Sequence, residues 1–326
     1  MEKNIQLSLV IPAHNSESTL GKVLPALIEQ TNRYSSEIIV VNDGSQDETA
    51  PTVLKCAKRS RTTEVLLVNQ DSQGQPAALN HGIRRARGKI LLFMDSDIIP
   101  GRQFVQKHME LHERFKAERA GCQGPVLIAA PGGPLNWRSS TGVARAAECI
   151  SDWTRIRFSN ISLKRNFLMN QPSLFAVHLR LLHDIEMASR LWEKGFQVYY
   201  SPEARGYHVH PRSLDDFLKR AEEEARAMNA WIQAEPHAAR MLSQEHFRTR
   251  FYYISPRPPF HCRLKSFVRR LLMNRRTEGL LIRLCKRISG VNFPVAYRIS
   301  SQMFINRFTQ AYKRFQQGFP ERQTHP

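Results

Sequence analysis

The sequence has no long hydrophobic run. All of its apolar stretches fall short of the roughly 18 to 20 residues that are needed to span a bilayer. The first four residues, Met-Glu-Lys-Asn, lead directly into a short strand-like run and do not have the pattern of a signal peptide. We therefore expect a protein that is made in the cytosol and stays there.

Cysteine is scarce and scattered. The chain has five cysteines, an odd number, and no two of them form a Cys-x-x-Cys pair. This pattern argues against a disulfide framework and against a zinc site, and it favours a reducing compartment. The five are Cys56, Cys122, Cys149, Cys262 and Cys285.

Two glycine-rich phosphate-binding motifs are also missing. No Gly-x-Gly-x-x-Gly follows the first apolar run, and no Gly-x-x-x-x-Gly-Lys occurs in the chain. The sequence therefore supports neither a dinucleotide-binding fold nor a P-loop nucleotidase.

Acidic residues are rare in the last quarter of the chain. From Arg240 to the end there are 18 Lys and Arg residues but only three Asp and Glu residues, and this region carries most of the net charge of +19. The charge pattern predicts a nearly neutral domain over residues 1–245 and a basic extension over residues 246–326. Such an extension is expected to bind an anionic partner, which could be a membrane surface, a nucleic acid or an acidic polymer.

Apolar residues recur in this extension at helical spacing. Basic amphipathic helices of this kind are typical of membrane-surface elements, although they also occur as helices that pack on a domain and leave a basic face in water. We favour the membrane interpretation. The apolar positions include Leu264, Phe267, Val268, Leu280, Leu281, Leu284, Ile288, Phe304, Ile305, Phe308, Tyr312 and Phe315.

In the first third of the chain, strands alternate with helices. Apolar strand-like runs cover residues 7–12, 37–41, 65–68 and 90–94, and a helical pattern with capping residues follows each of the first three. This alternation predicts an α/β fold with a doubly wound, mostly parallel sheet. In such sheets ligands bind at the carboxyl ends of the strands.

Carboxylates stand at this predicted edge. Asp43 follows the second strand, and Asp95 and Asp97 follow the fourth, separated by one serine. Two carboxylates at a strand end can bind a divalent cation, and the cation can bind a diphosphate. Taken alone, the Asp-x-Asp pattern also fits a strand that ends in a polar turn.

Four motifs together give a specific resemblance. Residues 7–100 resemble the nucleotide-sugar-binding half of a family 2 glycosyltransferase, which has the A-type glycosyltransferase fold. The motifs are Val10-Ile11-Pro12-Ala13-His14-Asn15, Val40-Val41-Asn42-Asp43-Gly44-Ser45-Gln46-Asp47, the stretch from Gly74 through Asn80-His81-Gly82-Ile83 with Ala86-Arg87-Gly88, and Asp95-Ser96-Asp97.

The resemblance implies a role for each matching residue. It places Asp43 on the base or ribose of a nucleotide sugar, Asp95 on the ribose and sugar, and Asp97 on a Mg²⁺ or Mn²⁺ ion. The backbone of Pro12 and Ala13 would contact the nucleotide. The remaining nucleotide-sugar-binding positions that it implies are Gly74 and Asn80.

A second part of the resemblance lies around residue 184. Asp184 matches the Asp that deprotonates the acceptor hydroxyl in this family, and His183 stands where Glu is usual. His208 matches a metal-binding His that follows a later strand. The structural alternatives are that Asp184 only stabilises a helix N-terminus and that His208 only packs in the fold.

Two further stretches bear on the acceptor. Residues 160–165 resemble an Asn-x-Ser-x-x-Arg stretch that lines the acceptor side in this family, but they also fit an ordinary strand with a polar edge. The Gln-x-x-Arg-Trp motif of processive polysaccharide synthases is absent, and three glutamates, residues 222–224, occupy that region. The resemblance therefore implies the transfer of one sugar rather than polymerisation.

These observations predict a metal-dependent, inverting hexosyltransferase of cell-envelope glycan synthesis. The expected donor is a UDP-sugar, and the expected acceptor is a hydroxyl of a glycan or of a lipid-linked sugar. The basic extension would hold the enzyme at the inner face of the membrane. Two alternatives remain: a nucleotidyltransferase on a similar sheet, and a non-catalytic basic protein that binds nucleic acid or membranes.

Overall fold

The structure, a computed structural model, describes residues 4–128, 149–150, 152–209 and 214–235, and part of 260–317 (260, 263–264, 267–269, 273, 275–288 and 293–317). The chain forms two units. The first comprises residues 1–129 and 138–210, and the second comprises residues 130–137 and 211–326. The domain boundary that we expect after residue 245 falls outside the described residues.

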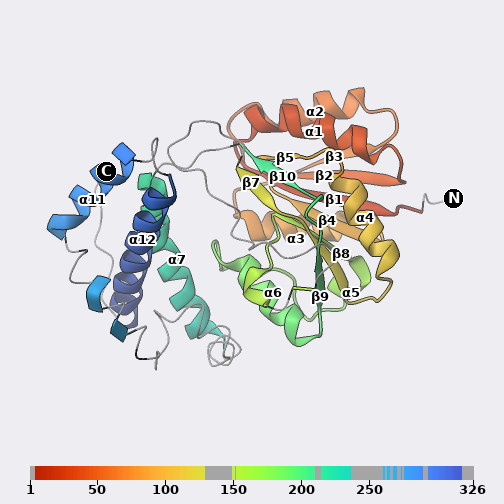
Figure 1. Ribbon diagram of the computed structural model, residues 1–326. Coiled ribbons are helices and arrows are strands. Elements are labelled where there is room, and N and C mark those ends of the chain that lie inside the picture. The colour runs from red at the N-terminus through yellow and green to blue at the C-terminus, as the bar shows by residue number, and fades with distance from the viewer. Residues whose placement is uncertain are drawn as a thin grey trace. The chain divides into compact units, whose positions relative to one another are not determined.

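The first unit is built on a seven-stranded sheet (Figure 1), in the order β3-β2-β1-β4-β8-β6-β9. β1, β2, β3 and β4 are parallel to one another, whereas β8 is antiparallel to both of its neighbours, β4 and β6. The strands are β1 (Leu7–Ala13), β2 (Ser36–Asp43), β3 (Glu64–Gln70), β4 (Ile90–Met94), β6 (Ala120–Gln123), β8 (Asn160–Lys164) and β9 (Gln197–Tyr200). The predicted doubly wound α/β fold is confirmed.

Helices cover both faces of the parallel strands, which is why these strands are apolar without alternation. On one face, alternate side chains of β1, β2 and β4 form the main core with α1 (Glu17–Thr31), α2 (Thr49–Arg59) and α4 (Phe104–Arg114). On the other face lies α3 (Gln75–Arg85), whose Gly82 packs so tightly that a Cβ atom there would lie 2.5 Å from Val10. Both layers of helices therefore fix the parallel strands, and with them the edge where the strands end.

A small second sheet and three short helical segments complete this unit. The sheet has the order β5-β10-β7, with β5 (Ile98–Pro100) directly after Asp97. Its other strands are β7 (Val126–Ile128) and β10 (Gly206–His208), and the helical segments are a 3-10 turn (Trp153–Arg155), α5 (Arg165–Met169) and α6 (His183–Glu193).

The described part of the second unit is helical. Its named helices are α7 (Leu214–Ala234), α11 (Arg275–Ile288) and α12 (Phe293–Gln316), and the described residues 260, 263–264 and 267–269 are helical as well. α7 and α12 pack on each other through the rings of Phe217 and Phe304, which stack with their centroids 4.6 Å apart. Among the described helices, none combines the length and apolar character needed to cross a membrane.

Candidate active site

Asp43 fixes the loop between β3 and α3. Its side chain is buried at the end of β2, and its carboxylate accepts three hydrogen bonds of 2.8 Å. The donors are the side-chain amide of Gln70 and the backbone N–H groups of Gln73 and Gly74. Gly74 has φ +93°, a conformation that favours glycine. Asp43 thus shapes this loop, and its contact with a base or ribose stays a prediction.

Hydrogen bonds tie together the loops that follow β1, β2 and β4. The backbone N–H of Asn15 donates to Ser45 Oγ at 2.9 Å, and the side-chain oxygen of Asn15 accepts from the backbone N–H of Gln46 at 2.9 Å. The hydroxyls of Ser16 and Ser96 lie 2.8 Å apart. Ser96 stands between Asp95 and Asp97, so this contact holds the Asp-x-Asp turn against the first loop. Pro12 and Ala13 are buried at the end of β1, beside these loops.

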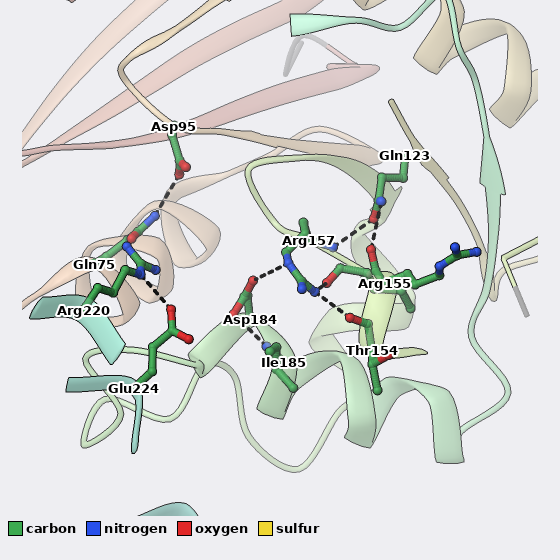
Figure 2. A network of polar contacts seen from close by, with 11 residues as sticks. Gln75, Asp95, Gln123, Thr154, Arg155, Arg157, Asp184, Ile185, Arg220 and Glu224 are labelled. Carbon is green, nitrogen blue, oxygen red and sulfur yellow. Dashed lines mark hydrogen bonds and ion pairs between the residues drawn. The ribbon is translucent and has the colours of Figure 1, made fainter. Parts of the chain in front are cut away.

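Asp95 lies half-buried at the end of β4. Gln75 Nε2 donates to its carboxyl group at 2.8 Å (Figure 2). Burial and the negative charges of Asp97 and Asp184 together raise the pKa of Asp95 to about 7, while His208 opposes them. The charges of Asp97, Asp184 and His208 therefore all act on the carboxyl group at the end of β4.

Strand pairing brings Asp97 and His208 together. β5 and β10 are antiparallel with His208 opposite Ile98, and the backbone N–H of Val209 donates to the carbonyl oxygen of Asp97 at 3.0 Å. As a result, His208 Nε2 lies 3.1 Å from Asp97 Oδ2. The described residues contain no group of three or more potential metal ligands. A carboxylate and an imidazole suit a divalent cation that takes its other ligands from water or a substrate diphosphate, so these residues fit the implied metal.

Asp184 lies in the first turn of α6, with its side chain about one quarter exposed. Arg157 Nε is 3.8 Å from Asp184 Oδ2 (Figure 2). The same guanidinium is fixed by its Nη1, which donates to the carbonyl oxygens of Thr154 at 2.8 Å and Ile156 at 2.7 Å. The sequence analysis did not single out Arg157, because no local motif connects it with a residue 27 positions later.

Asn80 holds the segment that leads into α6. Its side-chain amide donates to the carbonyl oxygen of Phe175 at 2.8 Å and accepts from the N–H of Phe175 at 2.9 Å, and both groups are buried. The ring of Phe175 packs edge-on against Phe93 and Phe158. The nitrogen and the oxygen of the Asn80 side-chain amide are thus both hydrogen-bonded to the backbone of Phe175. The contact of Asn80 with a nucleotide stays a prediction.

Asn160 and Ser162 belong to a buried network in the middle of the sheet. His108 Nε2 lies 2.8 Å from Asn160 Oδ1, and the hydroxyl of Ser162 lies 2.8 Å from His108 Nδ1 and 2.9 Å from His112 Nε2. Burial lowers the pKa of His108 to about 4 and that of His112 to about 3. Asn160 also donates to the carbonyl oxygen of Ala204 at 2.8 Å. The residues 160–164 thus form a central strand whose polar side chains bind the fold itself.

The comparison with protein families covers the part of this arrangement that precedes α6, and it does not reach Asp184 or His208. A model described as glycosyl transferase family 2 matches residues 8–174, which include Asp43, Asp95 and Asp97. The chain belongs to glycosyl transferase family 2. The expected family and the expected enzyme class, a glycosyltransferase, are thereby confirmed.

Named relatives agree with this assignment. The chain is 26% identical to the glycosyltransferase AglE of Haloferax volcanii over 226 residues, which are 66% of this chain and 70% of AglE. It is 39% identical to the dolichyl-phosphate beta-glucosyltransferase ALG5D of Trichomonas vaginalis over 101 residues, which are 28% of this chain and 30% of that relative. Sequence similarity to the glucosyltransferase is thus limited to less than a third of either chain.

Solved structures show the same fold at low sequence identity. The mannosyltransferase PcManGT from Pyrobaculum calidifontis, in complex with GDP-Man and Mn²⁺, matches with a TM-score of 0.62 and 14% identity over 96% of this chain and 88% of that one. S. aureus TarS 1–349 matches with a TM-score of 0.56 and 15% identity over 98% and 93% of the two chains. These neighbours confirm the A-type glycosyltransferase fold.

Proposed function

We propose that this enzyme is a metal-dependent, inverting glycosyltransferase that moves one sugar from a UDP-sugar to a hydroxyl of a lipid-linked or other glycan acceptor. The observation that carries the proposal is the 3.1 Å contact between Asp97 and His208, together with the charges of these two residues and of Asp184, which all act on Asp95 at the end of β4. A site of this kind combines cation ligands with a partly exposed carboxylate, that of Asp184, which can accept a proton.

The loops around Asp43 would bind the donor. Backbone groups at Pro12 and Ala13 and in the loop at Gly74 would contact the nucleotide, and Asp95 would bind hydroxyls of the ribose and sugar. Asn80 acts from a distance in this account, because its amide orders the segment that leads to the acceptor side.

Asp97 and His208 would hold the Mg²⁺ or Mn²⁺ ion. When bound, such an ion neutralises negative charge on the leaving diphosphate. One structural neighbour has GDP-Man and Mn²⁺ bound, which supports a divalent metal in this fold.

Asp184 would act as the general base. Its carboxylate accepts the proton of the acceptor hydroxyl while the hydroxyl oxygen forms a bond to the anomeric carbon and the bond from that carbon to the diphosphate oxygen breaks. A single displacement of this kind inverts the anomeric configuration. Arg157 would keep the Asp184 carboxylate oriented toward the acceptor, since its own position is fixed by two backbone carbonyls.

The names of relatives support a lipid-linked acceptor. They include dolichyl-phosphate beta-glucosyltransferases and, at 23% identity over 65% of this chain, the dolichyl N-acetyl-alpha-D-glucosaminyl phosphate 3-beta-D-2,3-diacetamido-2,3-dideoxy-beta-D-glucuronosyltransferase of Methanococcus voltae. An enzyme that acts on such acceptors works at a membrane surface. We therefore propose a peripheral position on the inner face of the membrane, held by the basic extension.

The proposal is tested by the configuration of the product and by its metal dependence. The enzyme is incubated with α-linked UDP-sugars and a polyprenyl-phosphate-linked sugar acceptor, and the anomeric proton of the product is followed by NMR. We expect a β-linked product, no product after chelation with EDTA, and recovery with Mn²⁺ or Mg²⁺. Retention of configuration would contradict the single displacement, and full activity in EDTA would contradict the metal site.

Family membership argues against both alternatives from the sequence analysis. A nucleotidyltransferase would release pyrophosphate from a nucleoside triphosphate and a sugar phosphate, which supplies a direct control assay. A non-catalytic binding protein would give no turnover with any donor.

A further inference from the structure

The structure divides the apolar residues of the basic extension into two groups. One group, on α12, is used inside the second unit. Met303, Phe308 and Tyr312 are buried, and Phe304 stacks on Phe217 of α7. These side chains form the core of the helical unit, so they cannot contact a membrane while that unit stays folded.

The second group lies on α11, which has two distinct faces. Its inner face contributes Leu281, Ile282 and Cys285 to the core formed by α7 and α12. Its outer face carries Leu280, which is 60% exposed, and Leu284, which is 44% exposed. The helix therefore exposes two leucines on the side that does not pack.

Arginines stand among these exposed leucines. Arg283 and Arg287 are both exposed, and with Leu280 and Leu284 they follow the spacing i, i+3, i+4, i+7 that puts side chains on one side of a helix. The acidic residue of α11, Glu278, pairs with Arg307 of α12. We call the set Leu280, Arg283, Leu284 and Arg287 the outer face of α11.

A helical segment before α11 repeats the pattern. Phe260 is 77% exposed, Leu264 53%, Phe267 60% and Val268 42%, and Arg263 between them is also exposed. The next residue, Arg269, is buried and donates to the side chain of Gln302 on α12 at 3.1 Å, so this segment is attached to the helical unit. Six of the nine large apolar side chains that are exposed among the described residues belong to these two stretches.

We infer that the outer face of α11, together with the exposed residues Phe260, Arg263, Leu264, Phe267 and Val268, docks the enzyme on a bilayer rich in anionic phospholipid. Exposed leucine and phenylalanine side chains lower the free energy by burying their apolar surface at the boundary between headgroups and acyl chains. Arginines beside them bind lipid phosphates. A nucleic acid would use the arginines but would leave the apolar side chains in water. A second copy of this chain would bring two basic faces together and meet repulsion.

The inference rests on the proposed function only for its purpose, the access to a lipid-linked acceptor. Binding to lipid vesicles can be measured without any turnover, so failure of the docking surface and failure of the proposed glycosyl transfer can be distinguished. The outer face of α11 contains no residue of the candidate active site.

The test is flotation of the full-length protein with vesicles of phosphatidylglycerol and phosphatidylcholine, compared with vesicles of phosphatidylcholine alone. The main variant is Leu280→Glu with Leu284→Glu. A matched control is Leu54→Glu, which changes a leucine of similar exposure, 49%, on α2 of the other unit. A second variant, Arg283→Gln with Arg287→Gln, tests the charges and keeps the leucines.

We expect the wild type and Leu54→Glu to float with the anionic vesicles. The double leucine variant should bind at least about tenfold more weakly, and the double arginine variant about 25-fold more weakly at low salt, since each arginine near an anionic leaflet contributes about fivefold. Circular dichroism and the melting temperature serve to check that the variants are folded. Donor turnover without vesicles should be unchanged in all of them.

Two results would overturn the inference. One is equal flotation of the wild type and both double variants. The other is a wild type that does not float but forms a dimer in light scattering, with the dimer lost in the double leucine variant, because the face would then be an interface between copies.

Discussion

Replacing Asn80 separates a positioning role from a nucleotide-binding role. Two buried hydrogen bonds join the Asn80 side chain to the backbone of Phe175: Asn80 Nδ2 donates to the carbonyl oxygen at 2.8 Å, and Asn80 Oδ1 accepts from the N–H at 2.9 Å. Asn80→Ala removes both bonds and leaves a buried N–H group and a buried carbonyl group without these partners. We expect this variant to be less stable and to lose the order of the segment before α6.

The expected loss follows from these two bonds. Each buried backbone group that loses its partner costs about 1 to 3 kcal/mol, so the loss of both should lower the free energy of unfolding of Asn80→Ala by about 2 to 6 kcal/mol. For a unit of this size, 1 kcal/mol corresponds to a change of roughly 2 to 4 °C in melting temperature. The melting temperature should therefore fall by about 4 to 24 °C. Packing of Phe175 against Phe93 and Phe158 would limit the loss of structure.

The assay combines thermal unfolding with steady-state kinetics. Asn80→Ala should lower the melting temperature and kcat at a temperature where the variant is folded, while the KM for the nucleotide sugar stays within about twofold. Asn166→Ala, which changes an exposed asparagine on α5, is the matched control and should behave as the wild type. An unchanged melting temperature together with a large rise in donor KM would refute the positioning role and support direct contact with the nucleotide.

Two further predictions concern charged and titratable groups. Arg157→Lys should lower kcat about 10- to 100-fold with little change in donor KM or melting temperature. The reason is that a lysine cannot bind two backbone carbonyls and still face Asp184. A rise in donor KM with unchanged kcat in steady-state kinetics would contradict this prediction. The pKa values of His108 and His112, about 4 and about 3, lie below the usual value of about 6.5, so the unfolded chain takes up protons first as the pH falls. The free energy of unfolding should be at its full value above about pH 6.5 and should fall by several kcal/mol toward pH 4. His108→Gln should make the free energy of unfolding, measured by urea titration, less dependent on pH. Equal slopes of the free energy of unfolding against pH for the variant and the wild type would contradict this prediction.

The fold was predictable from sequence because its signals are local. Continuous apolar strands, helical spacing and capping residues specify each element, and the alternation of elements specifies a parallel sheet. The position of β8 was not predictable in this way. It pairs antiparallel with β4 across about 70 residues of chain, and its polar side chains are satisfied by His108 and His112 of α4. Such pairing depends on tertiary contacts that no short stretch contains.

The candidate site was only partly predictable for the same reason. The motifs led to Asp95, Asp97 and Asp184, but not to Arg157, whose role follows from a contact between distant segments. The stretch Ala86-Arg87-Gly88 belongs to a matched motif but lies away from the candidate site. Arg87 donates to the buried carboxylate of Glu37 at the start of β2. That part of the motif stabilises the far end of the strands. Matching a motif therefore does not by itself place a residue in the site.

The extension shows how burial changes an interpretation. Its apolar residues have the same helical spacing throughout, so the sequence could not distinguish residues that pack from residues that face solvent. The structure buries Met303 and Tyr312 of α12 and exposes Leu280 and Leu284 of α11. Among the described residues of the extension, only the exposed set is placed to contact a membrane as we propose.

The most direct test of the central proposal is release of nucleoside diphosphate from a panel of nucleotide sugars with Mn²⁺ or Mg²⁺ and acceptor-bearing membranes. The wild type is compared with Asp97→Ala, Asp184→Asn and, as a control, Asp215→Asn, which changes an exposed carboxylate of the helical unit. We predict release from one donor, retained in Asp215→Asn and lost in Asp97→Ala and Asp184→Asn. Absence of release from every donor, or unchanged release in both site variants, would contradict the proposed glycosyl transfer at this site.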